Sequence, residues 1–161
     1  MNIVSILVLI GFAAACALAA STGAAFPPGE WYEHLVKPSW RPPNWLFAPA
    51  WTILYLTIAV SGWLVWRDIG FAAAALPLAV YAVQLVLNAA WTPIFFGLHR
   101  LDLAFFEIVL LWLSIIATIA LFHPLNAGAA WLLVPYLAWV TFAAALNLAI
   151  WRLNGASVLP G

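Results

Sequence analysis

The sequence predicts an all-α protein, a membrane-embedded bundle of five transmembrane helices with a long loop between the first two helices. The first observation behind this prediction is composition. Of 161 residues, 68% are hydrophobic and 6% are charged, and the mean hydropathy is +1.10. A soluble domain has about a quarter of its residues charged, so this chain cannot be a soluble globule. The formal net charge of zero excludes a nucleic-acid partner and leaves the lipid bilayer as the expected surroundings.

The second observation is a series of five apolar stretches, each long enough to cross a bilayer. A helix needs about 20 residues to span a hydrocarbon core of about 30 Å. Charged residues or Pro and Gly clusters separate the stretches. The predicted spans are residues 2–22, 43–66, 72–97, 102–122 and 128–152, in a single five-span domain over residues 1–161. The short turns between the later spans predict antiparallel neighbours in one bundle.

The boundaries of the spans have physical causes in the sequence. The first span has no Lys or Arg before its apolar stretch, so we interpret it as a retained helix rather than a cleaved signal peptide. The second span follows Pro42 and Pro43, because proline suits the first turn of a helix. Asp102 is expected to cap the fourth span. Three prolines lie inside spans and predict local kinks: Pro77, Pro93 and Pro135.

Basic residues predict an orientation in the membrane. Four of the five lie on the side of the long first loop and the carboxyl terminus, and only Arg67 lies on the other. Because basic residues favour the cytoplasmic side, we expect the long first loop and the carboxyl terminus in the cytoplasm. The four are Lys37, Arg41, Arg100 and Arg152. The Ala-rich composition and the lack of an amino-terminal transit peptide favour a bacterial source.

Polar and small residues within the spans indicate how the helices contact each other. The third span carries the stripe Tyr81, Gln84 and Asn88, and the fifth span carries the stripe Tyr136, Trp139, Ala143 and Asn147. Both stripes are expected to point into the bundle, either as interhelical hydrogen bonds or as a ligand-lining surface. Small residues also recur every four positions in the first span, which suits close packing inside the molecule or in a dimer: Gly11, Ala15, Ala19 and Gly23.

Titratable residues offer little for conventional catalysis. The single Cys16 excludes an internal disulfide, and we expect it to be a buried thiol. Glu107 is the only acid well inside a span, where it either reaches the interface, pairs with Arg100 or has a functional role. We find no Ser/His/Asp arrangement, carboxylate pair or metal-ligand cluster, so no metal site and no obligatory cofactor is predicted.

The eleven tryptophans are the most unusual feature of the composition. Trp66, Trp131 and Trp151 lie near predicted helix ends, where tryptophan anchors helices at the membrane interface. Six others gather around the first loop and the helices near it: Trp31, Trp40, Trp45, Trp51, Trp91 and Trp139. A concave site lined by Trp and Tyr with a few polar groups suits a large, flat, mostly apolar ligand.

Three segments resemble the TspO / translocator protein (tryptophan-rich sensory protein) family. Residues 37–55 read KPSWRPPNWLFAPAWTILY, which looks like the family signature KPxWxPPxW followed by PxWTxLY. Residues 81–97, YAVQLVLNAAWTPIFFG, resemble its third helix, and residues 134–147, VPYLAWVTFAAALN, resemble its fifth. The resemblance covers essentially the whole chain in order, and it implies a five-helix bundle that is often a homodimer, with the first loop closing over a pocket.

The resemblance implies a ligand and the residues that hold it. Family members bind porphyrins such as protoporphyrin IX and haem, and eukaryotic members bind cholesterol and benzodiazepine-type drugs. Carried over by position, the ligand-binding residues are Trp31, Tyr32, Trp51, Asn88, Trp91, Trp139 and Ala143. Lys37 and Arg41 are expected to contact the porphyrin propionates. The sequence departs from the animal proteins at Leu148, where they carry a Tyr of a proposed cholesterol motif, which argues against sterol binding through that motif.

Three functional hypotheses follow. The leading one is a tetrapyrrole-binding membrane protein that acts as a sensor, carrier or regulator of tetrapyrrole metabolism or a stress response. The second is an enzyme for light-dependent porphyrin degradation, in which Trp51 and Trp139 would be the catalytic residues, since they match tryptophans implicated in that reaction in bacterial relatives. The third is a transporter of porphyrin or other lipophilic ligands, although the sequence shows no inverted repeat or ring of intramembrane charge.

Overall fold

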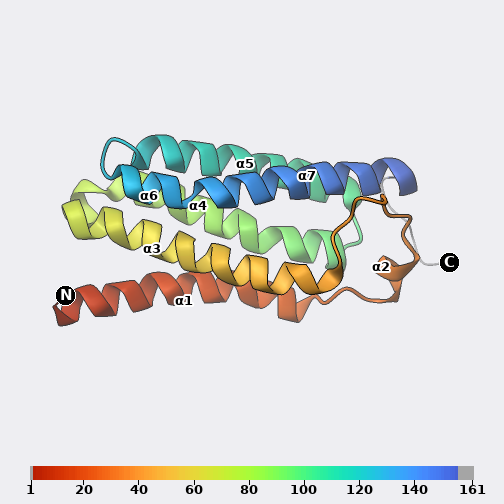
Figure 1. Ribbon diagram of the computed structural model, residues 1–161, viewed down its shortest axis with the longest axis horizontal. Helices are drawn as coiled ribbons and strands as arrows, with labels where there is room; N and C mark the ends of the chain where they lie inside the picture. The colour runs from red at the N-terminus through yellow and green to blue at the C-terminus, as the bar shows by residue number, and fades with distance from the viewer. Residues whose placement is uncertain (1, 156–161) are drawn as a thin grey trace.

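The computed structural model describes residues 2–155, and the helices run lengthwise side by side (Figure 1). The elements in order are α1 (Ile3–Ala25), α2 (Glu30–His34), η1 (Asn44–Leu46), α3 (Phe47–Ala73), α4 (Ala75–Thr92), the π-helix η2 (Pro93–Gly97), α5 (Leu101–Phe122), α6 (Ala127–Leu132) and α7 (Val134–Asn154). The described residues contain no strand. Five segments are long and apolar enough to cross a membrane, namely Ile3–Ala25, Asn44–Ala73, Ala75–Gly97, Leu101–Phe122 and Ala127–Asn154. The predicted all-α fold with five spans is confirmed.

Most span boundaries lie within a few residues of their predicted positions. Gly70 has φ 76° and ψ 172°, so it interrupts the helical backbone of α3 just after the predicted end of the second span. Pro93 begins the π-helix, and Pro135 follows the break between α6 and α7, so both mark irregularities as predicted. Pro77 lies in the first turn of α4, where it causes no kink. The predicted domain covers residues 1–161, and its end residues 1 and 156–161 lie outside the described residues.

One predicted helix cap is wrong. Arg100, not Asp102, is the N-cap residue of α5, and it provides no side-chain cap. Asp102 lies instead in the first turn of the helix, and its carboxylate accepts two hydrogen bonds from the Arg100 guanidinium, at 2.8 and 2.6 Å. This pairing raises the pKa of Arg100. A carboxylate in the first turn is still stabilised by the positive end of the helix dipole. The sequence therefore correctly indicated that Asp102 lies at the start of the helix, but not that it lies after the N-cap position.

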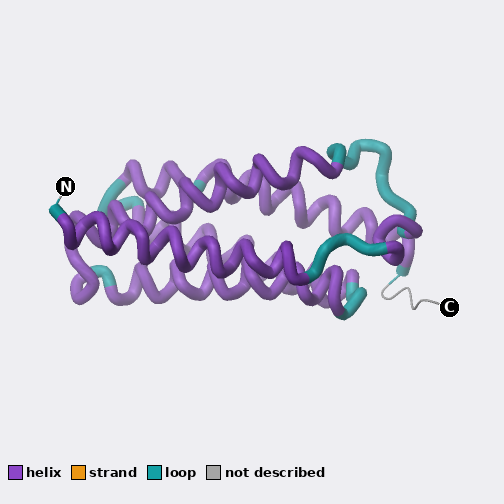
Figure 2. Tube along the Cα trace, turned by 90° about the horizontal axis from the view of Figure 1, so that it is seen from below, coloured by secondary structure: helices purple, strands orange, loops and turns teal. Residues whose placement is uncertain are grey.

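The long loop and α2 lie at one end of the bundle, beside the carboxyl end of α7 (Figure 1). α1 packs on α3 and α4, while α5 packs on α4 and α7. Seen from below, the helices run the length of the molecule and the loops lie at its two ends (Figure 2). Arg67 belongs to the end away from the long loop, and the other four basic residues belong to the long-loop end. Which end faces the cytoplasm remains a prediction of the sequence.

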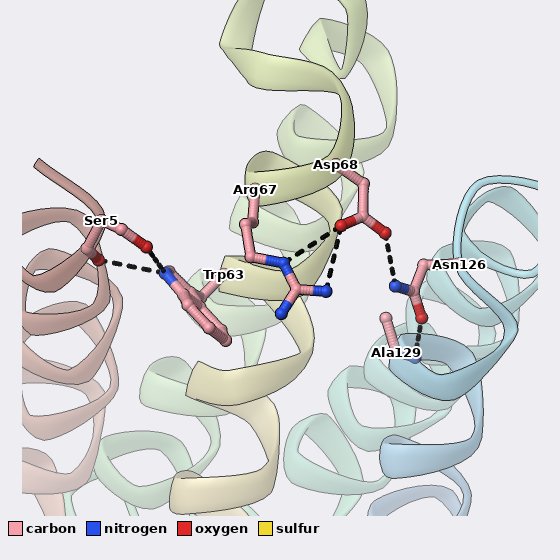
Figure 3. Close-up of polar contacts among 6 residues, drawn as sticks. All are labelled: Ser5, Trp63, Arg67, Asp68, Asn126 and Ala129. Atoms are coloured by element: carbon pink, nitrogen blue, oxygen red, sulfur yellow. Dashed lines mark hydrogen bonds and ion pairs between the residues drawn. The ribbon is translucent and has the colours of Figure 1, made fainter. Parts of the chain in front are cut away.

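Polar contacts join three helices at the end away from the long loop (Figure 3). The Trp63 indole on α3 donates to the backbone carbonyl of Ser5 on α1 at 3.0 Å. Asp68 pairs with the neighbouring Arg67 and accepts a hydrogen bond from the Asn126 amide at 2.7 Å. The same Asn126 caps α6, because its side-chain oxygen accepts from the backbone N–H of Ala129 at 2.8 Å. These contacts join α1, α3 and the start of α6 at this end of the bundle.

The small residues of α1 do not form one contact surface within the molecule. Ala19 is buried against the other helices. Gly11 has nothing within 4 Å of the position where a Cβ would stand, and Ala15 is exposed. The four-residue spacing predicts a continuous ridge, but an α-helix turns 100° per residue, so residues four apart drift around the helix. Packing inside the molecule therefore uses only part of that ridge.

We expect Gly62→Ala to destabilise the protein by about 1–3 kcal/mol, because it overpacks a tight helix contact. A Cβ on Gly62 would lie 2.7 Å from Cε1 of Phe12 on α1 and 2.9 Å from Cζ of Tyr81 on α4. The measurement is the free energy of unfolding in mixed detergent micelles. Gly11→Ala is the matched control in an open position of a helix, and it should be neutral or slightly stabilising. Equal stability of the two variants would show that the α1–α3 contact is not tightly packed.

Candidate ligand-binding site

A cavity of about 730 Å³ lies inside the bundle, beneath the long loop. Its wall is formed by α1, α3, α4, η2, α5 and α7, together with Tyr32 of α2 and Asn44 of η1 in the loop region. This volume is within the range of about 300–1,000 Å³ that is usual for small-molecule sites. Six of the seven predicted ligand-binding residues line it: Tyr32, Trp51, Asn88, Trp91, Trp139 and Ala143. The structure thus brings together side chains from the loop, α3, α4 and α7.

Aromatic rings form much of the cavity wall. Trp51 on α3 and Trp139 on α7 meet edge to face, with ring centroids 6.5 Å apart. Phe47 packs edge to face on Trp139 at 5.7 Å, and Trp91 stacks on Phe95 at 4.8 Å. Such arrangements are favourable by about 0.5–1.5 kcal/mol beyond burial, so the rings hold one another in place. The wall therefore offers a pre-formed aromatic surface to an apolar ligand.

Two asparagines tie the helices together behind this wall. Asn88 accepts a hydrogen bond from the Tyr55 hydroxyl at 2.6 Å and donates to the Tyr136 hydroxyl at 2.9 Å. This chain joins α3, α4 and α7. Asn147 accepts from the Trp91 indole at 3.2 Å and donates to the backbone carbonyl of Leu101 at 2.9 Å. Both predicted polar stripes point into the bundle, and their asparagines serve as interhelical hydrogen bonds while also lining the cavity.

The Trp139 indole differs from its neighbours in lacking a partner. Its Nε1 is buried and has no hydrogen-bond acceptor among the described residues. By contrast, the indole nitrogens of Trp63, Trp91 and Trp112 donate to Ser5, Asn147 and Thr141. A buried donor without an acceptor costs about 1–3 kcal/mol. Trp139 thus supplies an aromatic face to the cavity, while its indole nitrogen is buried away from the cavity space.

The remaining predicted residues lie around the cavity rather than on its wall. Trp31 stacks on the His99 imidazole, with ring centroids 4.1 Å apart, and so fastens α2 to the turn after η2. Trp40 and Trp45 are exposed. The sequence showed that these tryptophans belong to the loop region, but it did not show which of them face the cavity.

Lys37 and Arg41 converge on Tyr32 from the outer side of the loop. The Lys37 ammonium lies 4.6 Å from the centre of the Tyr32 ring and donates to two backbone carbonyls. Arg41 donates to the Tyr32 hydroxyl at 3.3 Å and to Asn44 at 2.9 Å. Burial lowers the pKa of Lys37, and nearby Glu33 opposes this shift. Neither cation forms a salt bridge with any described residue, and neither lines the cavity, although Tyr32, which both contact, does.

Two buried polar side chains outside the cavity have no hydrogen-bond partner among the described residues. Gln84 on α4 is 1% exposed, and neither end of its amide has a partner among the described residues. Glu107 on α5 is also buried, and neither of its carboxylate oxygens has one. The predicted pairing with Arg100 is wrong, because Arg100 pairs with Asp102. The predicted reach to the interface is also wrong, because both carboxylate oxygens are buried inside the bundle. Neither side chain lines the cavity.

Sequence reasoning missed several residues of the wall. Tyr55 lies one turn after Trp51 on the same face of α3, so its helical spacing could have revealed it. Cys16 and the neighbouring alanines of α1 also line the cavity. No sequence signal distinguishes that face of α1, because alanine is frequent on all its faces.

The fold and the site together define a class, namely multi-pass membrane proteins with an aromatic cavity inside a five-helix bundle. The chain belongs to the TspO/MBR family, whose model matches residues 4–152. It is similar to Protein CrtK of Rhodobacter capsulatus, with 51% identity over 144 residues, 87% of this chain and 88% of that protein. It is also similar to the Tryptophan-rich sensory protein of Cereibacter sphaeroides, with 44% identity and 89% of each chain covered. The human Translocator protein is 40% identical over 90% of this chain and 89% of its own length.

Proposed function

We propose that this protein binds a porphyrin- or haem-type tetrapyrrole in the aromatic cavity and acts as a sensor, carrier or regulator of tetrapyrrole metabolism. The observation that carries the proposal is the pair Trp51 and Trp139, which present two large rings to a cavity of about 730 Å³. A flat apolar macrocycle gains about 1 kcal/mol per ring contact beyond its burial.

Charge at the cavity mouth supports the same ligand class. Lys37 and Arg41 lie beside Tyr32, which itself lines the cavity, and neither cation forms a salt bridge with a described residue. A tetrapyrrole carries propionates at one edge of an otherwise apolar ring. Charge-assisted hydrogen bonds from Lys37 and Arg41 would hold those propionates at the wet mouth while the ring lies among the tryptophans. The ligand class thus matches both the apolar interior and the cationic rim.

The experiment is a titration of the purified protein with protoporphyrin IX in the dark. Binding is monitored by the quenching of tryptophan fluorescence. We expect saturable quenching, and we expect Trp51→Phe/Trp139→Phe to weaken binding by about tenfold, because two ring contacts are reduced. The control is Trp131→Phe, which removes an exposed indole outside the cavity and should leave the affinity unchanged. Absence of saturable quenching would contradict the proposed function.

A second candidate function is light-dependent porphyrin degradation. The specific observation in its favour is that both tryptophans implied for that reaction lie on the cavity wall and contact each other. An indole beside a light-excited porphyrin can donate an electron to it, with dioxygen as the final oxidant. Illumination of the bound complex should then produce new absorbance that Trp51→Phe/Trp139→Phe abolishes at saturating porphyrin. Equal photochemical rates in the two proteins would rule out this role.

A further inference from the structure

The water-facing end of the cavity is closed by the long loop. Trp31 stacks on His99, and Tyr32 packs edge to face on Phe96 at 5.4 Å. The Asn154 amide at the end of α7 makes two hydrogen bonds to the backbone of Val36, each 2.8 Å long. A ligand that arrived from water would have to break these contacts first.

The contact between α1 and α3 changes along its length. Toward the end away from the loop the helices are tightly packed, since Gly62 leaves no room for a Cβ beside Phe12 and Trp63 donates to Ser5 (Figure 3). Toward the loop, the facing side chains on the cavity wall are small. On α1 these are Ala13, Ala17 and Ala20, and on α3 they are Ala48 and Thr52. We call this stretch of the cavity wall, where α1 and α3 carry these small side chains, the α1–α3 slot.

The α1–α3 slot reaches the outer surface of the bundle. Leu56 lines the cavity and is nevertheless 61% exposed. Ala13, Ala17 and Thr52 are likewise exposed residues of the cavity wall. Because α1 and α3 both belong to segments long and apolar enough to span a membrane, we expect the surface at this slot to face lipid. The long loop thus covers one end of the cavity, and the α1–α3 slot is an exposed part of the cavity wall.

We propose that the ligand reaches the cavity from the lipid bilayer, through the α1–α3 slot, and not through the loop-covered end. This inference rests on the proposed function and adds the route and the kind of ligand that can use it. The bilayer concentrates a flat apolar molecule beside the slot, because burying its surface in hydrocarbon is favourable. The ligand is thus an amphiphile that dissolves in the membrane with its charged edge at the headgroups, where the cationic loop end meets it.

The first test measures the rate constants for protoporphyrin IX binding to the protein in lipid nanodiscs. Ala17→Phe narrows the slot, and we expect it to lower the association and dissociation rate constants together, each by about tenfold. A mere loss of binding contacts would instead raise the dissociation rate constant. Ala15→Phe is the control, because Ala15 is exposed on α1 but does not line the cavity, and both of its rate constants should be unchanged. Asn154→Ala releases the loop and should not accelerate association.

The opposite pattern would overturn the proposal. If Asn154→Ala accelerates association and Ala17→Phe leaves it unchanged, the ligand enters from the water side. A second test needs no porphyrin and separates the slot from the proposed function. Phospholipids with brominated acyl chains should quench the Trp51 emission, measured as the difference between the native protein and Trp51→Phe, and Ala17→Phe should reduce that quenching.

The two tests can fail separately. If brominated chains quench Trp51 but protoporphyrin IX does not bind, the proposed function is wrong. The inference that the α1–α3 slot is accessible from the lipid would still be supported. If brominated chains do not quench Trp51, the slot is closed to lipid and the inference is wrong, whatever the porphyrin does.

Discussion

Ala143→Phe should lower the affinity for protoporphyrin IX by about a hundredfold, which corresponds to about 2.7 kcal/mol. Ala143 lies on the cavity wall one helical turn after Trp139. A benzyl group at this position would enter the space beside the Trp51 and Trp139 rings, and a closely packed wall cannot move aside without strain. The measurement is the equilibrium titration by tryptophan-fluorescence quenching, carried out in the dark.

The matched control for this change lies two residues further along the same helix. Ala145 is exposed and does not line the cavity, so Ala145→Phe adds the same side chain to α7 on its lipid-facing side. We expect wild-type affinity and stability from this variant. If Ala143→Phe and Ala145→Phe bound porphyrin equally well, the ligand would not occupy the cavity described above.

Asn88→Leu should lower the free energy of unfolding by about 2 kcal/mol, because it leaves buried hydroxyl groups unpaired. The Asn88 amide connects the hydroxyls of Tyr55 and Tyr136, and the Tyr136 side chain is fully buried. Leucine has a similar size but neither accepts nor donates a hydrogen bond. Reversible unfolding in mixed detergent micelles measures the difference from the native protein.

A double-mutant cycle distinguishes the hydrogen bond from a change in packing. Tyr55→Phe removes the donor that Asn88 accepts at 2.6 Å. If the hydrogen bond accounts for the loss, the double variant Tyr55→Phe/Asn88→Leu should lose less unfolding free energy than the two single variants lose together. The expected difference is about 0.6 kcal/mol or more, the average for interhelical hydrogen bonds in membranes. Strict additivity would mean that the two side chains do not interact in the membrane protein.

The sequence was sufficient for the spans, because their signal is local and strong. Charged residues and proline cannot continue a lipid-exposed helix without cost, so Arg67 and Pro135 lie close to real breaks in the helices. The inward stripes of α4 and α7 were also predictable. A polar side chain such as Asn88 or Asn147 is costly in hydrocarbon, and both are buried between helices. Homodimerisation stays a prediction of the resemblance.

The site was predictable only in part. Position along the family motifs placed Trp51, Trp91 and Trp139 on one cavity wall, as the structure does. The same reasoning placed Trp31 in the pocket, whereas its ring stacks on His99 outside the wall. Trp31 lies on α2, a five-residue helix inside the segment expected to be a loop, and so short a helix offers no periodicity from which the direction of its side chain could be predicted.

What the sequence by itself determined is the set of five apolar helices, their order and the polar faces that must avoid lipid, because each follows from the cost of placing charge or unpaired backbone in hydrocarbon. Only the tertiary structure decided how the faces of α1 are used, since alanine packs equally well against a neighbour, a cavity or lipid. Only the structure shows that Ala17 lies on the cavity wall at the α1–α3 slot and that the backbone of Val36 is hydrogen-bonded to the Asn154 side chain. Only the structure shows that the Trp139 indole has no acceptor among the described residues. These features depend on contacts between distant residues, which local hydropathy does not encode.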